Sequence, residues 1–201
     1  MKLVSAIFHP LLMATYTSLL LYFILPSIYS PILAAFIPYL IGITFITTFF
    51  IPALSLIFMR YTHRISNLDI TSKDERAVPF LLITCFYGFS TYLFYDKLHV
   101  SYAVISIMGT TTFLILLLSI LTAYIKISIH AAAIWGLCGI MSAMYLLHLD
   151  TSNILLLATL FMAAGITSTS RLYLQRHKSE EVWIGAGIGF LICFSGTYLF
   201  V

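Results

Sequence analysis

Long apolar segments dominate this 201-residue chain and restrict what it can fold into. A helix needs about 20 apolar residues to cross the hydrocarbon core of a bilayer. Seven segments reach this length or come close to it: 3–25, 32–59, 79–95, 100–124, 131–149, 153–169 and 182–201. Only 8% of the residues are charged, whereas soluble domains average about 25%. The sequence therefore predicts an all-α fold, a polytopic transmembrane helical bundle of about six to seven spans. We expect one integral membrane domain over residues 1–201.

The charged residues gather in three of the connections between these segments, at 60–78, 125–130 and 170–181. With seven spans, these three loops alternate to the same side of the membrane. Nine of the ten Lys and Arg residues then lie on that side, and only Lys97 lies opposite. We expect a site assembled from the three same-side loops, although a solvated basic face that only orients the protein is the simpler alternative.

The side chains in these loops suit phosphate chemistry. Arginine and lysine bind anionic phosphate groups. Histidines, here His130 and His177, can attack phosphorus or donate a proton to a leaving group. A carboxylate four positions from a histidine on a helix, as Glu181 is from His177, can hold the imidazole in one tautomer. No HExxH motif, Cys/His metal spacing or glycine-rich phosphate loop is present, so the residues suggest phosphoryl transfer through histidine.

The stretch "SRLYLQRHKSEE" (170–181) has the form Ser-Arg-x5-His-x3-Glu. It resembles the third signature of the type-2 phosphatidic acid phosphatase superfamily, Ser-Arg-x5-His-x3-Asp. The stretch "SIHA" (128–131) resembles the second signature, Pro-Ser-Gly-His, and "KDERAVP" (73–79) is a weaker match to the first, Lys-x6-Arg-Pro. The order agrees with the family, and the resemblance covers about residues 73–189.

The resemblance implies a phosphatase site that uses no metal and no cofactor. His177 would be the nucleophile, Glu181 would orient it, and His130 would protonate the leaving oxygen. The residues implied to bind the substrate phosphate are Arg171, Lys73, Arg76, Ser128 and Ser170.

Four departures from the family pattern bear on activity. Ile127 and Ile129 replace the proline and the glycine of the second signature, and Val78 stands where the first has arginine. Glu181 replaces aspartate in the third. Glycine lets a backbone approach a phosphate closely, and isoleucine does not. These changes fit a divergent enzyme, and they equally fit a relative that binds phosphate with little or no turnover.

The expected function is that of an integral membrane lipid phosphatase, which hydrolyses a lipid-linked phosphate or pyrophosphate through a phosphohistidine. The alternatives are a catalytically weak or inactive lipid-phosphate binder and, third, a small transporter. We expect a lipid phosphate substrate and membrane lipids as partners, no nucleic acid, and location in a bacterial inner (cytoplasmic) membrane. The resemblance implies a site on the outer face, whereas the positive-inside rule places it in the cytoplasm.

His9, in the first apolar segment, also stands out, because ionisable groups within a membrane are costly. A hydrogen bond to the carbonyl groups freed by Pro10 explains it at least as well as a function.

Overall fold

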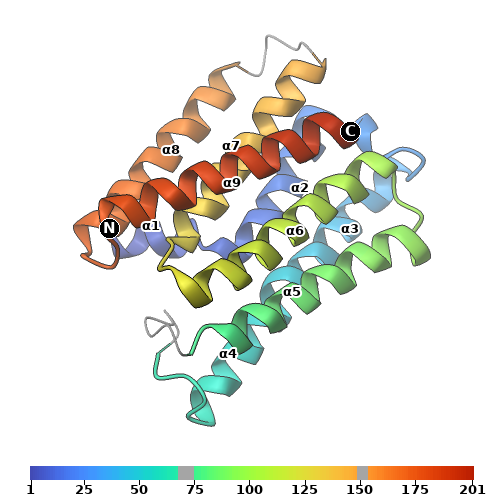
Figure 1. Cartoon of the computed structure of the whole chain (residues 1–201). Coiled ribbons are helices and arrows are strands. Elements are labelled where there is room, and N and C mark those ends of the chain that lie inside the picture. The colour runs from blue at the N-terminus through green and yellow to red at the C-terminus, as the bar shows by residue number, and fades with distance from the viewer. Residues whose placement is uncertain (68–74, 149–153) are drawn as a thin grey trace. The chain divides into compact units, whose positions relative to one another are not determined.

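The computed structural model describes residues 1–67, 75–148 and 154–201, and every regular element in these ranges is helical (Figure 1). The elements run in this order: α1 (Lys2–Ile7), η1 (Pro10–Leu12), α2 (Met13–Ile24), η2 (Pro26–Tyr29), η3 (Ala34–Phe36), α3 (Ile37–Phe45), η4 (Ile46–Phe50), α4 (Ile51–Tyr61), α5 (Ala77–Tyr92), η5 (Leu93–Lys97), α6 (Tyr102–Tyr124), α7 (Ile129–His148), α8 (Ile154–Tyr173) and α9 (Ser179–Phe200). The predicted all-α polytopic transmembrane bundle is confirmed.

Six continuous helical stretches in the described part of the chain are long and apolar enough to cross a membrane. They are Ala34–Tyr61, Ala77–Lys97, Tyr102–Tyr124, Ile129–Leu147, Ile154–Tyr173 and Ser179–Phe200. They correspond to six of the seven segments expected from hydropathy, and the predicted ends at 149 and 153 lie outside the described residues. The chain is therefore an integral membrane protein.

The first predicted span, 3–25, is the exception, because its helix breaks near its beginning. His9 has extended backbone angles (φ −70°, ψ 136°) between α1 and η1. Pro10 explains the break, since proline disfavours a helical conformation at the residue before it. The apolar helix that follows, Pro10–Ile24, has 15 residues and so measures about 23 Å, short of the roughly 30 Å of hydrocarbon. The segment is therefore interrupted at His9, and its crossing of the membrane stays a prediction.

The chain divides into two compact units, one of Met1–Met13 with Ile127–Val201 and the other of Ala14–Lys126. In the second unit, hydroxyl pairs join neighbouring helices within the apolar interior. Thr47 of η4 lies 2.9 Å from Ser90 of α5, and Thr91 of α5 lies 3.0 Å from Thr112 of α6, oxygen to oxygen. Such pairs keep polar groups satisfied where lipid offers no partner. The expectation of one membrane domain stays a prediction.

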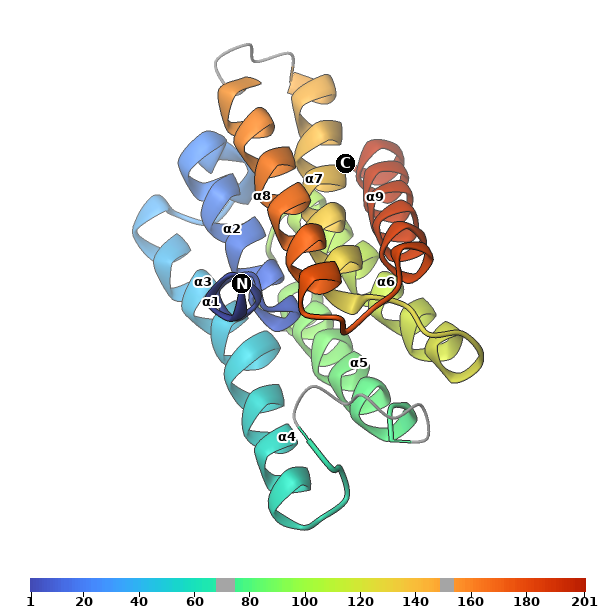
Figure 2. The ribbon, with the colours of Figure 1, turned by 90° about the vertical axis from the view of Figure 1, so that its left-hand side faces the viewer.

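In the first unit, α7, α8 and α9 lie side by side, and α1 packs against α8 (Figures 1 and 2). The closest approach is between α7 and α9, where glycines allow backbone contact. A Cβ added to Gly139 would lie 2.5 Å from the Phe190 carbonyl oxygen, and one added to Gly185 would lie 2.6 Å from the Ser128 carbonyl oxygen. This packing fixes the beginning of α9 against the segment that precedes α7.

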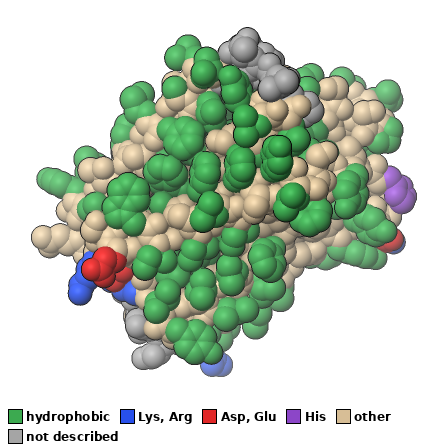
Figure 3. All heavy atoms as spheres, turned by 45° about the horizontal axis from the view of Figure 1, so that its top comes forward, with side chains coloured by type: hydrophobic (Ala, Val, Ile, Leu, Met, Phe, Trp, Pro, Cys, Tyr) green, Lys and Arg blue, Asp and Glu red, His purple; other side chains and the backbone are tan. Residues whose placement is uncertain are grey.

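The surface agrees with a membrane environment. Hydrophobic side chains dominate the face that Figure 3 shows, and the charged side chains visible there lie at its edges. Lipid-facing positions of a spanning helix need no polar partner, so such a face is expected of a protein whose helices contact hydrocarbon.

Candidate functional site

The connection from α8 to α9 is set by the way in which α8 ends. The Gln175 N–H donates to the Leu172 carbonyl at 2.9 Å, and the Arg176 N–H donates to the Arg171 carbonyl at 3.2 Å. Gln175 has a φ of +52°, in the left-handed region. These features define a Schellman motif, a compact reversal that ends a helix. The motif reverses the chain between Arg171 and His177, and His177 follows immediately after the turn.

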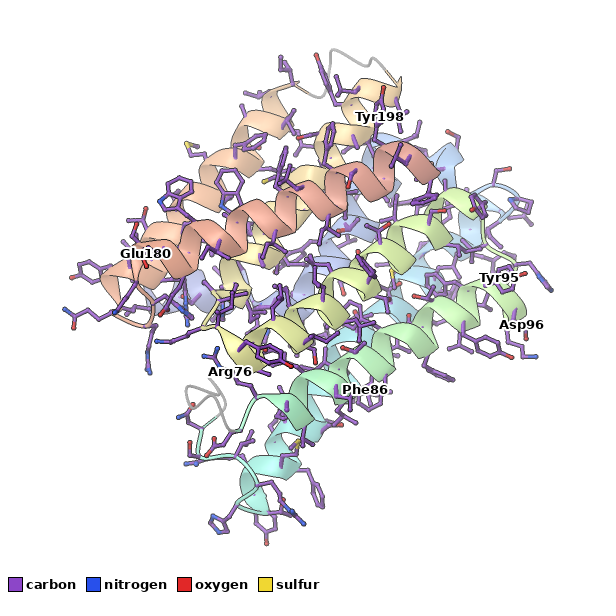
Figure 4. The ribbon with its side chains drawn as sticks, viewed as in Figure 1. Arg76, Phe86, Tyr95, Asp96, Glu180 and Tyr198 are labelled. Carbon is purple, nitrogen blue, oxygen red and sulfur yellow. The ribbon has the colours of Figure 1, made fainter. Side chains whose placement is uncertain are left out.

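The beginning of α9 orients His177. Glu181, in the first turn of α9, folds back so that its Oε2 lies 2.8 Å from Nδ1 of His177. The same oxygen accepts a hydrogen bond from the backbone N–H of Lys178 at 3.3 Å. The two side chains are largely buried, with 8% of His177 and 15% of Glu181 exposed. Glu180, labelled in Figure 4, marks this end of α9, and Tyr198 lies near the other. His177 precedes the helix, so the pair does not share one helix face as the spacing had suggested.

Ser128 connects the beginning of α7 to the beginning of α9. Its backbone N–H donates to the Glu181 carbonyl at 3.0 Å, and its Oγ accepts from the Ala131 N–H at 3.4 Å. The serine is fully buried. It therefore caps α7, and its amide is committed to α9, while its hydroxyl hydrogen can still be donated.

His130 is the second residue of α7 and lies in the same unit as His177. Its imidazole interacts electrostatically with Arg171, His177 and His9, and it is hydrogen-bonded to the backbone of Ser5. The two histidines and the arginine predicted from separate loops are thus brought together.

Arg171 and Ser170 lie in the last turn of α8, and both are buried. The Arg171 side chain is 6% exposed, and its Nη1 donates to Oγ of Ser5 at 3.4 Å. The Ser170 hydroxyl donates to the Met1 carbonyl at 3.0 Å, and its Oγ lies 3.2 Å from that of Ser5. The N-terminal segment is therefore the neighbour of both residues.

His9 is a further residue at this site, and the motif comparison did not include it. Its ring centroid lies 5.6 Å from that of His130, at an interplanar angle of 81°. Its Nδ1 accepts a hydrogen bond from the Leu11 N–H at 3.3 Å. This hydrogen bond comes from a backbone N–H beyond Pro10. A hydrogen bond from His9 to a carbonyl freed by Pro10 stays a prediction. The sequence signal was a histidine before a proline in an apolar segment.

The described residues of the first predicted signature fall outside this unit. Lys73 lies outside the described residues, and Arg76 belongs to the other unit. Arg76 precedes α5, and Tyr95 and Asp96 lie at the opposite end of the same helical stretch (Figure 4). Six predicted site residues do lie in one unit: His177, Glu181, His130, Arg171, Ser170 and Ser128.

The two isoleucines of the second signature have packing roles. Ile127 is fully buried, and its Cγ2 would lie 3.2 Å from a Cβ placed on Gly185 of α9. Ile129 is the first residue of α7. A helix that begins at this residue has no use for the conformational freedom of glycine there.

Within the described ranges, no group of three or more His, Cys, Asp and Glu side chains is placed to hold a metal ion. The site's polar groups are imidazoles, a carboxylate, a guanidinium and hydroxyls.

Comparisons of the chain with protein-family models, with curated proteins and with solved structures gave no match. The function must therefore be argued from the site itself.

Proposed function

We propose that this integral membrane protein is a phosphatase that hydrolyses a lipid-linked phosphate or pyrophosphate through a phosphohistidine at His177. The observation that carries the proposal is the 2.8 Å contact between Nδ1 of His177 and Oε2 of Glu181, in a unit that also holds His130 and Arg171. The resemblance of residues 170–181 to the third signature of the type-2 phosphatidic acid phosphatases supports it.

The first chemical step is attack by His177. With its Nδ1 proton held by the Glu181 carboxylate, the ring has a lone pair on Nε2. Nε2 forms a bond to phosphorus while the bond from phosphorus to the lipid oxygen breaks. That oxygen takes a proton from His130, and the Glu181 carboxylate balances the positive charge on the phosphorylated ring.

In the second step, water attacks the phosphorus of the phosphohistidine. The bond from nitrogen to phosphorus breaks, inorganic phosphate leaves, and His130 takes back the proton that the water gives up. Arg171 is the cation that stabilises the phosphate oxygens in both steps, because phosphoryl transfer depends on positioning and on charge stabilisation. For a pyrophosphate, the leaving group is the lipid monophosphate.

One observation favours a second candidate, a lipid-phosphate binder with weak turnover. The Ser128 N–H donates to Glu181, and an Nη1 hydrogen of Arg171 is directed at Ser5. Donors committed to the protein stabilise a transition state less than donors aimed at the phosphate.

Phosphate release by the purified protein tests the proposal. The assay uses lipid monophosphates and a polyprenyl pyrophosphate in detergent with EDTA, and compares wild type, His177→Asn and His99→Asn. His99 lies in the other unit with a φ of +48°, which asparagine tolerates, so it is a matched control. We expect release by wild type and His99→Asn, and a loss of at least about 10³-fold in His177→Asn. Release that survives in His177→Asn would overturn the proposal. Lipid phosphate bound without turnover by wild type would favour the binder.

The proposal includes location in a bacterial inner membrane, and a labelling experiment decides which face carries the site. A cysteine replaces the exposed Ser179 in a Cys85→Ala background, because Cys85 is the exposed native cysteine. Labelling of intact spheroplasts by a membrane-impermeant maleimide places the site on the outer face. Labelling only after permeabilisation places it in the cytoplasm, as the charge distribution indicates.

A further inference from the structure

The N-terminal segment is a wall of the candidate site, although no signature includes it. Three of its groups contact site residues: the Met1 carbonyl accepts from Ser170, Ser5 accepts from Arg171, and the ring of His9 packs edge-on against that of His130. All of these residues belong to one compact unit. The break at Pro10 makes this arrangement possible, because it separates α1 from the apolar helix that follows.

His130 is held from the N-terminal side. Its imidazole is hydrogen-bonded to the backbone of Ser5, and the ring of His9 lies 5.6 Å away at 81°. A histidine in the first turn of a helix has several rotamers open to it, and each sends its proton in a different direction. Contacts from residues 5 and 9 therefore select the orientation of the group that must deliver a proton.

The state of the His9 ring follows from its own hydrogen bond. Nδ1 accepts from the Leu11 N–H, so it must carry a lone pair and cannot carry a proton. The neutral ring then has its proton on Nε2. The hydrogen bond from the Leu11 N–H to Nδ1 thus restrains the His9 ring beside the ring of His130.

We propose that His9 is a positioning residue of this site, whose ring holds the imidazole of His130 in the orientation that donates a proton to the leaving oxygen. The inference rests on the proposed phosphatase function and adds a residue to it. His9 contacts no reacting atom, and its effect passes through His130.

Two substitutions separate this role from simple capping of η1. His9→Asn retains an acceptor for the Leu11 N–H and removes the ring. His9→Phe retains a ring edge against His130 and removes the acceptor. Positioning by the ring predicts that the phenylalanine variant keeps lipid-phosphate turnover and the asparagine variant loses it. Capping alone predicts the reverse order.

The leaving group provides the readout that a structural role would not change. The leaving oxygen of an alkyl phosphate needs a proton, whereas p-nitrophenyl phosphate releases p-nitrophenolate, a stable anion that needs none. The ratio kcat/KM reports the steps up to formation of the phosphohistidine, before His130 acts on water. In His9→Asn and His130→Ala we expect kcat/KM on a long-chain alkyl phosphate to fall by roughly 10–100-fold. On p-nitrophenyl phosphate we expect kcat/KM of His9→Asn to stay within about 3-fold of wild type.

Each outcome decides between the proposals. Turnover of the alkyl phosphate by His9→Asn at the wild-type rate overturns the role of His9 and leaves the phosphatase proposal standing. So does an equal loss of kcat/KM on both substrates, because that loss does not pass through proton donation to the leaving oxygen. An absence of His177-dependent release in wild type overturns both proposals. Thermal unfolding of each purified variant checks that it is folded. If His9→Asn does not fold, the test rests on His9→Phe. Full turnover of the alkyl phosphate by His9→Phe then supports the proposal, and loss of that turnover contradicts it.

Discussion

Oε2 of Glu181 lies 2.8 Å from Nδ1 of His177 and 3.3 Å from the backbone nitrogen of Lys178. One carboxylate therefore both caps the first turn of α9 and orients the histidine that precedes the helix. The arrangement depends on the length of glutamate, because a glutamate at the third position of a helix reaches back beyond the N-cap residue. Glutamate at the position where the signature it resembles has aspartate is thus compatible with an orienting role.

The first prediction concerns Glu181→Gln. The amide oxygen can take the place of Oε2 and still accept from both Nδ1 of His177 and the Lys178 N–H. The substitution removes the negative charge that balances the phosphorylated ring. We expect kcat for the lipid phosphate to fall by roughly 10²–10³-fold, because the charge that stabilises the transition state is lost. The midpoint of thermal unfolding should change little. Glu181→Asp keeps the negative charge and is the control, so it should retain more activity than Glu181→Gln. An inactive aspartate variant beside an active glutamine variant would contradict the role of the Glu181 carboxylate.

Sequence reasoning predicted six polar residues that lie together in one unit, but not the N-terminal segment that contacts them. The spacing of residues 170–181 was informative because it encodes local structure: the last turn of α8, a Schellman reversal and the first turn of α9. The N-terminal wall was missed, because hydropathy averages over a window and reports an apolar segment whether or not its helix is continuous. The contacts of Ser5 with Arg171 and of His9 with His130 join residues more than 100 positions apart, and no spacing rule records such pairs.

The second prediction concerns the turn before His177. Gln175 has a φ of +52°, which a residue with a Cβ adopts at a cost and glycine adopts freely. We expect Gln175→Gly to raise the free energy of unfolding by about 1 kcal/mol, measured by thermal or chemical unfolding in detergent. Gln175→Ala retains the Cβ and should leave stability unchanged. A destabilised glycine variant would show that the glutamine side chain contributes more than the strain costs.

The third prediction concerns the close contact of α7 with α9. A Cβ on Gly189 would overlap the Ala132 carbonyl, whereas one on Gly187, two residues earlier on α9, would meet no atom within 4 Å. We expect Gly189→Ala to destabilise the protein by roughly 2–4 kcal/mol, because the contact is with backbone that cannot rotate away. Gly187→Ala should be neutral or stabilising by up to about 1 kcal/mol. Equal unfolding midpoints for the two variants would contradict the close packing.

The fourth prediction concerns Ser5, which accepts a hydrogen bond from Nη1 of Arg171 at 3.4 Å and lies 3.2 Å from Oγ of Ser170. If this hydroxyl holds the guanidinium in place for a substrate phosphate, Ser5→Ala should raise KM for the lipid phosphate by about 3–10-fold, the loss expected of one modest hydrogen bond. Arg171→Lys should have a larger effect, since a lysine ammonium cannot reproduce the planar, two-pronged contact of a guanidinium with phosphate.

Ser195→Ala on α9 is a matched control, because that hydroxyl donates to the Leu191 carbonyl of its own helix and faces outward. Steady-state kinetics on one lipid phosphate measure all three variants. An unchanged KM in Ser5→Ala beside a raised KM in Arg171→Lys would mean that the arginine binds phosphate without help from the N-terminal segment.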